Sequence, residues 1–401
     1  MAREIIFQKL PVGWSYNLLD NIAERCSGHT PSKSFPEYWN GGIKWISLAD
    51  SCRLDKGYVY ETDKEISLEG IKNSSAEVHP AETVVLSRDA GVGKSGVMAT
   101  PMAVSQHFIA WKCDNKEKLH SWYLYNWLQL NKEEFERQAV GSTIKTIGLP
   151  YFKKLRIAVP PFDEQKKIAQ ILSTWDKAIS VTEKLLTNSQ QQKKALMQQL
   201  LTGKKRLLDE NGVRFSGEWK QDVNLGSIIN ISKGVQINKN TLSEDGQFPV
   251  INGGIAPSGF TSEFNTDENT ITISEGGNSC GYVAFQKKSF WCGGHCYAVR
   301  KTALDLSFTF HLLKYNELKI MGLRVGSGLP NIQKKAIEAF TVNFPVTSVE
   351  QQKIAAVLSA ADDEIATLEK KLACLKDEKK ALMQQLLTGK RRVKIDEAVA
   401  A

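Results

Sequence analysis

Three short segments of the chain carry residue types that could do chemistry. GVGKS (91–95) ends in the Gly-Lys-Ser that some nucleotide-binding loops place around phosphate. DEQK (163–166) contains a Glu-x-Lys pair of the kind found in nucleases, and WCGGHC (291–296) brings two thiols and an imidazole within six residues, with Cys280 upstream. These segments would support nucleotide binding, metal-assisted cleavage and zinc binding, respectively.

None of these segments has the complete spacing that its chemistry requires. A phosphate loop needs a glycine five positions before Gly93, and Arg88 stands there. The close copy of DEQK at 349–352, VEQQ, has lost both the Asp and the Lys. WCGGHC lacks a second ligand pair at zinc-site spacing, and the six histidines show no metal-like spacing. We therefore expect no catalytic residues, no metal and no cofactor in this chain.

VPPF (159–162) has the two prolines of a loop that holds a target amine in amino-methyltransferases. That loop needs a polar side chain in front of the prolines, and this position is Val159. The prolines are better explained as the start of a helix, where a missing N–H costs nothing.

Composition places the chain among ordinary globular proteins. No run of about 18 apolar residues exists, so no membrane span is expected. The N-terminus lacks the apolar core of a signal peptide, which favours a cytoplasmic location. The net charge of +8 is compatible with a polyanionic partner but does not identify one.

An internal repeat gives the architecture. ALMQQLLTGK occurs at 195–204 and again at 381–390, and an ungapped match at an offset of 186 positions extends over about forty residues from EQKKIA (164–169) and EQQKIA (350–355). Such a length without a gap predicts one continuous helix per copy. Pro160 and Pro161 precede the first copy, Pro345 and Ser348 precede the second, and Gly203 and Gly389 follow them, which are helix start and stop signals.

Apolar residues in both copies alternate at spacings of three and four, as in a coiled-coil seam. The predicted seam is Ile168, Leu172, Trp175, Ile179, Thr182, Leu186, Ser189, Lys193, Leu196 and Leu200, and in the second copy Ile354, Leu358, Ala361, Ile365, Leu368, Leu372, Leu375, Lys379, Leu382 and Leu386. A single exposed helix of about 57 Å needs a partner, and we expect the two copies to pack antiparallel.

The segments before each helix look strand-rich and share a weak common order. KWIS (44–47) matches PVIN (249–252), ETVVLS (82–87) matches NTITIS (269–274), and Trp14 corresponds to Trp219. The sequence therefore predicts an α+β protein with pseudo-two-fold symmetry. Its expected parts are a β-rich globule at 1–162, a spacer helix at 163–206, a second globule at 207–348, a second helix at 349–392 and a tail at 393–401.

Two similar modules on a rigid spacer suit duplex DNA, on which modules on one face recur about every 34–36 Å. Different globules would read different half-sites. Insertion of residues within 187–193 is then expected to change the distance between half-sites without changing either of them.

This arrangement resembles the specificity subunit of type I restriction-modification systems over essentially the whole chain. The residues that carry the resemblance are PPFDEQKKIA and FPVTSVEQQKIA, the two copies of KKALMQQLLTGK with their basic ends, and the opening LPVGWSYNLLDNI with GHTPSKSFPEYWNGGIKWISLADS. The second globule is more divergent.

The resemblance implies two target-recognition domains that bind double-stranded DNA at a bipartite site. It also implies assembly with two modification subunits, which use S-adenosylmethionine, and with restriction subunits, which use ATP and Mg. It assigns no catalysis to this chain.

Candidate DNA contacts are basic side chains for phosphate and polar ones for base edges. In the first globule we expect Thr30, Lys33, Lys44, Ser47, Arg53, Arg88, Lys94 and Ser95, and in the second Lys233, Gln236, Asn238, Lys239, Asn252, Asn278, Lys287 and Lys288. Two alternatives stay open: a coiled-coil scaffold that carries two ligand-binding β-rich domains without specific DNA affinity, and an enzyme in its own right, which the incomplete motifs disfavour.

Overall fold

The computed structural model describes residues 10–113, 117–326 and 328–395. The chain forms two compact units, one of residues 1–182 with 371–401 and one of residues 183–370. Unit 1 thus combines the first globule with the start of one long helix and the end of the other, and unit 2 combines the second globule with the remaining halves.

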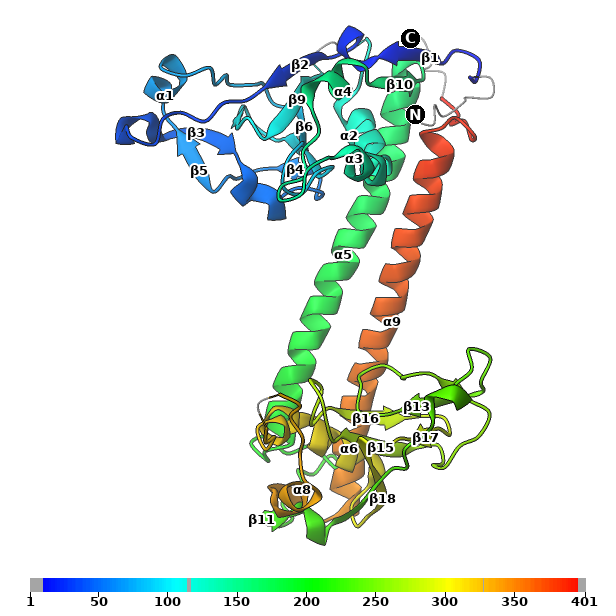
Figure 1. The fold of residues 1–401 in the computed structure, drawn as a ribbon. Helices are drawn as coiled ribbons and strands as arrows, with labels where there is room; N and C mark the ends of the chain where they lie inside the picture. The colour runs from blue at the N-terminus through cyan, green and yellow to red at the C-terminus, as the bar shows by residue number, and fades with distance from the viewer. Residues whose placement is uncertain (1–9, 114–116, 327, 396–401) are drawn as a thin grey trace. The chain divides into compact units, whose positions relative to one another are not determined.

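Unit 1 contains a five-stranded sheet of order β2-β9-β6-β7-β4, a three-stranded sheet β5-β3-β8 and the pair β1-β10. Helix α2 packs against β6 and β7 (Figure 1). The elements are β1 (Ser15–Leu18), β2 (Glu24–Ser27), β3 (Trp39–Ile46), β4 (Tyr58–Val59), β5 (Lys64–Ile66), α1 (Leu68–Lys72), β6 (Val84–Ser87), β7 (Ser95–Met98), β8 (Ala103–Val104), β9 (Phe108–Lys112), α2 (Ser121–Leu130), α3 (Lys132–Gln138), α4 (Leu149–Lys153) and β10 (Arg156–Val159).

Unit 2 repeats this plan with sheets of order β12-β18-β15-β16 and β14-β13-β17 and the pair β11-β19. Helix α6 packs on β16. The elements are β11 (Trp219–Asn224), β12 (Ile229–Lys233), β13 (Phe248–Ile251), β14 (Phe260–Thr261), β15 (Thr270–Ser274), β16 (Val283–Gln286), β17 (Trp291–Cys292), β18 (Cys296–Thr302), α6 (Leu306–Tyr315), α7 (Glu317–Met321), α8 (Lys334–Ala339) and β19 (Thr341–Pro345).

Strand registers confirm the sequence matches between the globules. Ile46 of β3 pairs in parallel with Val104 of β8, and Ile251 of β13 pairs in parallel with Cys292 of β17. KWIS and PVIN therefore occupy the same place. Likewise Ser87, at the end of β6, faces the first residue of β9, as Ser274, at the end of β15, faces the first residue of β18.

The repeated segments form the long helices α5 (Phe162–Leu200) and α9 (Ser348–Leu386). Each has 39 residues and is about 58 Å long. Their ends come six residues before the predicted limits at 206 and 392, because the chain turns at Gly203 (φ +70°) and Gly389 (φ +71°). Every residue of the predicted seam is buried or half-buried, so the three-four spacing identified the packed face correctly.

The helices pack antiparallel in both units. In unit 1, Ile168 and Leu172 near the start of α5 share the hydrophobic core with Met383 and Leu386 near the end of α9. In unit 2, Leu200 shares the core with Ile354 and Leu358. The α+β class with two β-rich regions and a packed helix pair is thereby confirmed.

Polar contacts of the helices recur at the repeat offset. Lys193 of α5 pairs with Asp362 in unit 2, and Lys379 of α9 pairs with Asp176 at 2.5 Å in unit 1. Adding 186 to 193 and to 176 gives 379 and 362, so the two contacts are the same contact made reciprocally. Each unit therefore contains the same ion pair between the two helices, with the helix that supplies the lysine exchanged.

In a second reciprocal contact, an arginine just after the end of each long helix binds a glutamate at the start of the other helix. The Arg206 guanidinium donates to both carboxylate oxygens of Glu350 at 2.6 and 2.7 Å, and Arg392 does the same to Glu164 at 2.7 Å. Gln165 and Gln351, the next residues, donate to the carbonyls of Pro160 and Pro345, respectively. We call these the two Arg–Glu clamps, 206–350 and 392–164.

Candidate nucleic-acid interface

The predicted contact residues can be placed by the edge of the sheet at which they lie. In unit 1 the ends of β2 and β6 and the start of β9 meet at one edge, since Ser27 faces Ile109 and Ser87 faces Phe108. In unit 2 the ends of β12 and β15 and the start of β18 meet in the same way. We call this side of each sheet the loop edge.

The loop edge of unit 1 carries a linked polar cluster. His107 Nδ1 lies 2.5 Å from Asp89 Oδ2, and Thr146 donates to the other oxygen of Asp89 at 2.6 Å. Arg88 donates through Nε to the carbonyl of Ile147 at 3.1 Å. Arg88 Nε also lies 4.0 Å from Asp89 Oδ1, and the Arg88 and His107 side chains are 19% and 35% exposed, so this cluster places a cation and an imidazole around one carboxylate at the edge.

The loop edge of unit 2 carries a carboxylate at its centre. Glu275 accepts from Lys233 Nζ at 2.6 Å and from the Tyr297 hydroxyl at 3.3 Å, and His295 Nδ1 lies 3.7 Å away. Asn252 Oδ1 accepts from the His295 backbone N–H at 2.9 Å. The Lys233 and His295 side chains are about half exposed, at 51% and 61%, so they remain open to a partner.

Backbone bonds show that these clusters occupy equivalent positions. The Arg88 N–H donates to the His107 carbonyl at 3.0 Å, as the Glu275 N–H donates to the His295 carbonyl at 2.9 Å. The carbonyls of Arg88 and Glu275 accept from Ile147 and Ile332, respectively. Arg88 and Glu275 are therefore structural counterparts of opposite charge, and His107 and His295 are counterparts of the same type.

In unit 1, the predicted contacts fall into two groups. Thr30, which bonds to Gln106, and Arg88 lie at the loop edge, and Lys33 is exposed in the loop after β2. Three cations are held by the protein itself: Lys44 by Tyr60 and Glu61, Arg53 by Asp50, and Lys94 by Ser51.

Two of the predicted DNA contacts, Ser47 and Ser95, are buried inside unit 1. Ser47 is 8% exposed and forms a capping box with Asp50, and Ser95 is fully buried and accepts from Gln129 at 2.7 Å. Both serines satisfy buried polar groups of their own unit.

In unit 2, most predicted residues gather at the loop edge. Lys233 and Asn252 belong to the cluster, Gln236 lies against Gly294, and Asn278 is exposed on the turn after β15. Asn238 and Lys239 are exposed in the same loop as Gln236, where Asn238 caps a short helical turn.

Lys287 and Lys288 lie at the opposite edge. β16 runs antiparallel to β15, and its last residue, Gln286, faces Thr270 at the start of β15. The two lysines follow Gln286 and are exposed there. They are thus separated from the loop edge by the length of the sheet.

The chemical motifs take structural roles. GVGKS forms the turn between β6 and β7, beside a hollow of about 370 Å³ lined by Ala90, Gly91, Val92, Glu136, Ala139, Thr143, Ile144 and Lys145. Glu164 of DEQK is buried in its Arg–Glu clamp. Burial of these groups in packing contacts accounts for the motifs without a reaction.

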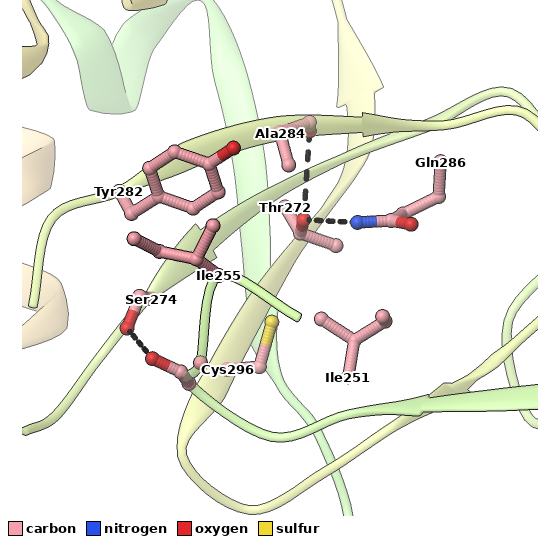
Figure 2. A pocket seen from close by; sticks show the side chains of 10 residues that line it. Ile251, Ile255, Thr272, Ser274, Tyr282, Ala284, Gln286 and Cys296 are labelled. Atoms are coloured by element: carbon pink, nitrogen blue, oxygen red, sulfur yellow. Dashed lines mark hydrogen bonds between the residues drawn. The ribbon is translucent and has the colours of Figure 1, made fainter. Parts of the chain in front are cut away.

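The thiols of WCGGHC point into their own unit. Cys292 Sγ contacts the carbonyl of Cys296 at 3.6 Å, and the Cys296 thiol contacts the carbonyl of Tyr297 at 3.6 Å. The hydrogen bond with Cys292, and then burial, raise the pKa of Cys296. Figure 2 shows Cys296 lining a cavity of about 10 Å³, room for about one water, in which Ser274 donates to the Gly253 carbonyl at 2.6 Å. The cavity is a packing gap under the 252–255 loop.

Sequence reasoning did not select four residues of the loop-edge clusters: Asp89, His107, Glu275 and His295. The matched strands ETVVLS and NTITIS carried a signal, because Arg88–Asp89 and Glu275 follow them directly. The histidines come directly before the next equivalent strands, and only the pairing order places them beside the acids.

Comparison with known proteins also finds two similar regions in the chain. The family model for the type I restriction modification DNA specificity domain matches residues 11–188 and again 217–377. No helix among the described residues is long and apolar enough to cross a membrane.

Relatives share parts or most of the chain. It is 37% identical over 141 residues to a protein of the type I specificity subunit class from Mycoplasma pneumoniae, a match that covers 34% of this chain and 37% of that one, and so less than half of the relative's length. It is 24% identical over 383 residues to the type I restriction enzyme MjaVIII specificity subunit of Methanocaldococcus jannaschii, covering 84% and 87%.

Among solved structures, the type I restriction-modification S subunit from M. genitalium matches with a TM-score of 0.66 at 19% identity, over 97% of this chain and 99% of that one, which shows a shared fold. With its two matched regions together spanning most of the residues, the chain belongs to the family of type I restriction modification DNA specificity domains.

Proposed function

We propose that this chain is a non-catalytic subunit that reads an asymmetric, bipartite sequence in double-stranded DNA, with one loop edge for each half-site. The observation that carries the proposal is the pair of equivalent loop edges with opposite charge at one backbone position, Arg88 in unit 1 and Glu275 in unit 2. Arginine favours the acceptors of guanine, whereas a carboxylate accepts from the amino group of cytosine. Two edges of one shape would thus recognise different bases.

The long helices suit the role of a spacer and scaffold. Their packed faces are joined by the reciprocal ion pairs, and their remaining faces are exposed and mostly polar, with Val181, Leu185 and Val349 as exposed apolar side chains. On this proposal the chain assembles with two modification subunits, which bind S-adenosylmethionine and methylate adenine, and with restriction subunits, which use ATP and Mg. The proposed setting is the cytoplasm, where the DNA is.

The test is a map of methylated adenines made with the chain and its modification subunits. Arg88→Ala should weaken recognition of one half-site by about 1–3 kcal/mol at one base pair, and His295→Ala should do the same in the other half-site. Changes confined to one half-site by each variant would support the assignment.

The matched control is the double variant Lys287→Ala, Lys288→Ala, because these lysines are exposed at the opposite edge of unit 2. It should leave the recognised sequence unchanged. If Arg88→Ala and His295→Ala also left the sequence unchanged while the complex still methylated DNA, the loop edges would not be the reading surface. If the chain without substitutions showed no sequence preference for DNA, a protein-interaction scaffold would be favoured instead.

A further inference from the structure

Cys26, Glu77 and His79 come together in unit 1. One ligand atom of each, a thiol sulfur, a carboxylate oxygen and a ring nitrogen, lies within 4.8 Å of the other two. Within the described ranges, no other group of three or more His, Cys, Asp or Glu side chains meets this limit. The sequence spacing gave no sign of it, because Cys26 and His79 are 53 positions apart.

The backbone fixes all three positions. Cys26 is in β2 and faces Ala110 of β9. His79 exchanges both backbone hydrogen bonds with Met102, at 2.8 and 3.0 Å. Glu77 precedes His79 by two residues, and its carboxylate lies within 4.8 Å of the other two ligand atoms.

The His79 side chain is a buried polar group without a partner in the described part of the chain. It is fully buried, and neither ring nitrogen has a hydrogen-bond partner among the described residues. An unpaired buried polar group costs about 1–3 kcal/mol, so native structures rarely keep one without a reason.

Unit 2 shows what occupies the equivalent place there. Strand pairing makes Ser232 the counterpart of Cys26, since they face Ala298 and Ala110, and the bridges Thr266–Phe290 and His79–Met102 make Thr266 the counterpart of His79. Arg300 lies between them and donates to Ser232 Oγ at 2.7 Å and to Thr266 Oγ1 at 3.1 Å. A cationic group therefore ties this strand to this segment in unit 2.

Unit 1 lacks such a bridge among its described side chains. The counterpart of Arg300 is Lys112, two residues after Ala110, and its ammonium pairs with Glu24 at 2.8 Å. Where unit 2 has the two hydroxyl side chains, unit 1 has Cys26 and His79, whose thiol and imidazole are groups that commonly bind metals. The place that a guanidinium fills in one unit is thus lined by metal-binding groups in the other.

We propose that unit 1 binds one divalent metal ion of the zinc type through Cys26 Sγ, an imidazole nitrogen of His79 and a carboxylate oxygen of Glu77. Thiolate and imidazole select Zn²⁺ over Mg²⁺ or Ca²⁺, and three protein ligands leave a fourth position for water. Glu77 is exposed, which gives the ion a path from solvent. The ion would tie β2 to the 77–79 segment, as Arg300 does in unit 2.

The charges around the site balance a divalent ion. A Cys26 thiolate with Glu77 and Glu24 gives three negative charges, and Lys112 on Glu24 cancels one of them. Two negative charges then remain for the metal, with His79 neutral.

The experiment uses the full chain in a Cys52→Ser, Cys374→Ser background, which removes two exposed thiols. Titration with Co²⁺ should give a thiolate-to-cobalt charge-transfer band that saturates at one ion per chain and disappears on addition of Zn²⁺. Cys26→Ser and His79→Asn should each abolish the band. Glu77→Gln should weaken Co²⁺ binding at least about tenfold, because even outer partners of a metal site contribute that much.

The control is Thr266→Val, at the counterpart of His79 in unit 2, which should leave the band unchanged. Circular dichroism of each variant reports its folding, and Glu77→Gln, an exposed change, keeps the test informative if a buried variant unfolds. No band in the parent chain, or a band that survives Cys26→Ser or Glu77→Gln at full affinity, overturns the proposal.

Discussion

The Arg–Glu clamps allow a prediction in which two chemically identical contacts differ in strength. Glu350 and Glu164 each accept two hydrogen bonds from an arginine, and each carboxylate is 1% exposed. The arginines differ: the Arg206 side chain is 20% exposed, and the Arg392 side chain is 42% exposed. Solvent therefore screens the 392–164 clamp more than the 206–350 clamp.

The perturbation is Glu350→Gln in unit 2 and Glu164→Gln in unit 1, which removes the charge and keeps the shape. Breaking a buried pair costs about 3–5 kcal/mol, and an exposed pair contributes about 0.2–1 kcal/mol. Since Arg206 is four-fifths buried, we expect a loss of about 3 kcal/mol for Glu350→Gln. The greater exposure of Arg392 reduces the expected loss for Glu164→Gln to about 1–2 kcal/mol.

The measurement is native-state hydrogen exchange with mass spectrometry, because peptides from each unit report its free energy of opening separately. Glu350→Gln should lower protection in unit 2, and Glu164→Gln should lower it in unit 1. Double-mutant cycles with Arg206→Gln and Arg392→Gln isolate the pairwise contribution. Equal losses in the two units, or a coupling below about 0.5 kcal/mol at 206–350, would refute the reasoning from exposure.

Three further outcomes are expected. Burial lowers the pKa of His311 to about 4, with Asp362 and Asp305 favouring and Lys193 opposing protonation. The unfolded chain therefore binds this proton more tightly than the folded chain does. The free energy of unfolding of unit 2 should fall by up to about 3 kcal/mol as the pH drops from about 6.5 to 4. In urea titrations His311→Gln should flatten this dependence, and an unchanged slope would exclude His311 as its source. Gly389→Ala should destabilise unit 1 more than Gly203→Ala destabilises unit 2, because an added Cβ would lie 2.5 Å from Pro11 Cγ in the first case and 3.3 Å from the Trp219 ring in the second. Each substitution also costs about 1 kcal/mol for the positive φ of its glycine. Thermal unfolding checks this order, and equal losses of stability would contradict it. A heptad inserted between residues 182 and 183 and another between 370 and 371 should lengthen the spacer by about 10 Å, or about three base pairs, with both half-sites retained. The adenine methylation map reports the new distance between the half-sites. A changed half-site would contradict the separation of spacer and reader.

Sequence reasoning identified the helices well, because their packing depends on a local rule. The three-four spacing places Leu172 and Leu358 on the packed face regardless of the rest of the fold, and both are fully buried. Their stop signals were equally local, although the last basic residues, Arg206 and Arg392, turned out to lie beyond the helices and to hold the clamps.

The positions of the predicted contact residues were harder to foresee, because they depend on strand order. A polar residue near a strand end can lie at either edge of a sheet, and Lys287 illustrates this: it follows a strand that runs opposite to β15. Ser95 shows a second difficulty, since a small polar side chain near a glycine-rich turn can serve the interior as well as a ligand. Position within the sheet decides these cases, and local sequence does not encode it.

The composition of unit 1 from residues 1–182 and 371–401 has a consequence for synthesis of the protein. Met383, Leu386 and Leu387 complete its hydrophobic core, yet they leave the ribosome after every residue of unit 2. Unit 2 is one continuous segment and can fold before the last residues of the chain are made. Unit 1 is synthesised first but cannot complete its hydrophobic core until those last residues are available. A released chain that ends at residue 370 should therefore contain a protease-resistant second unit and a protease-sensitive first one.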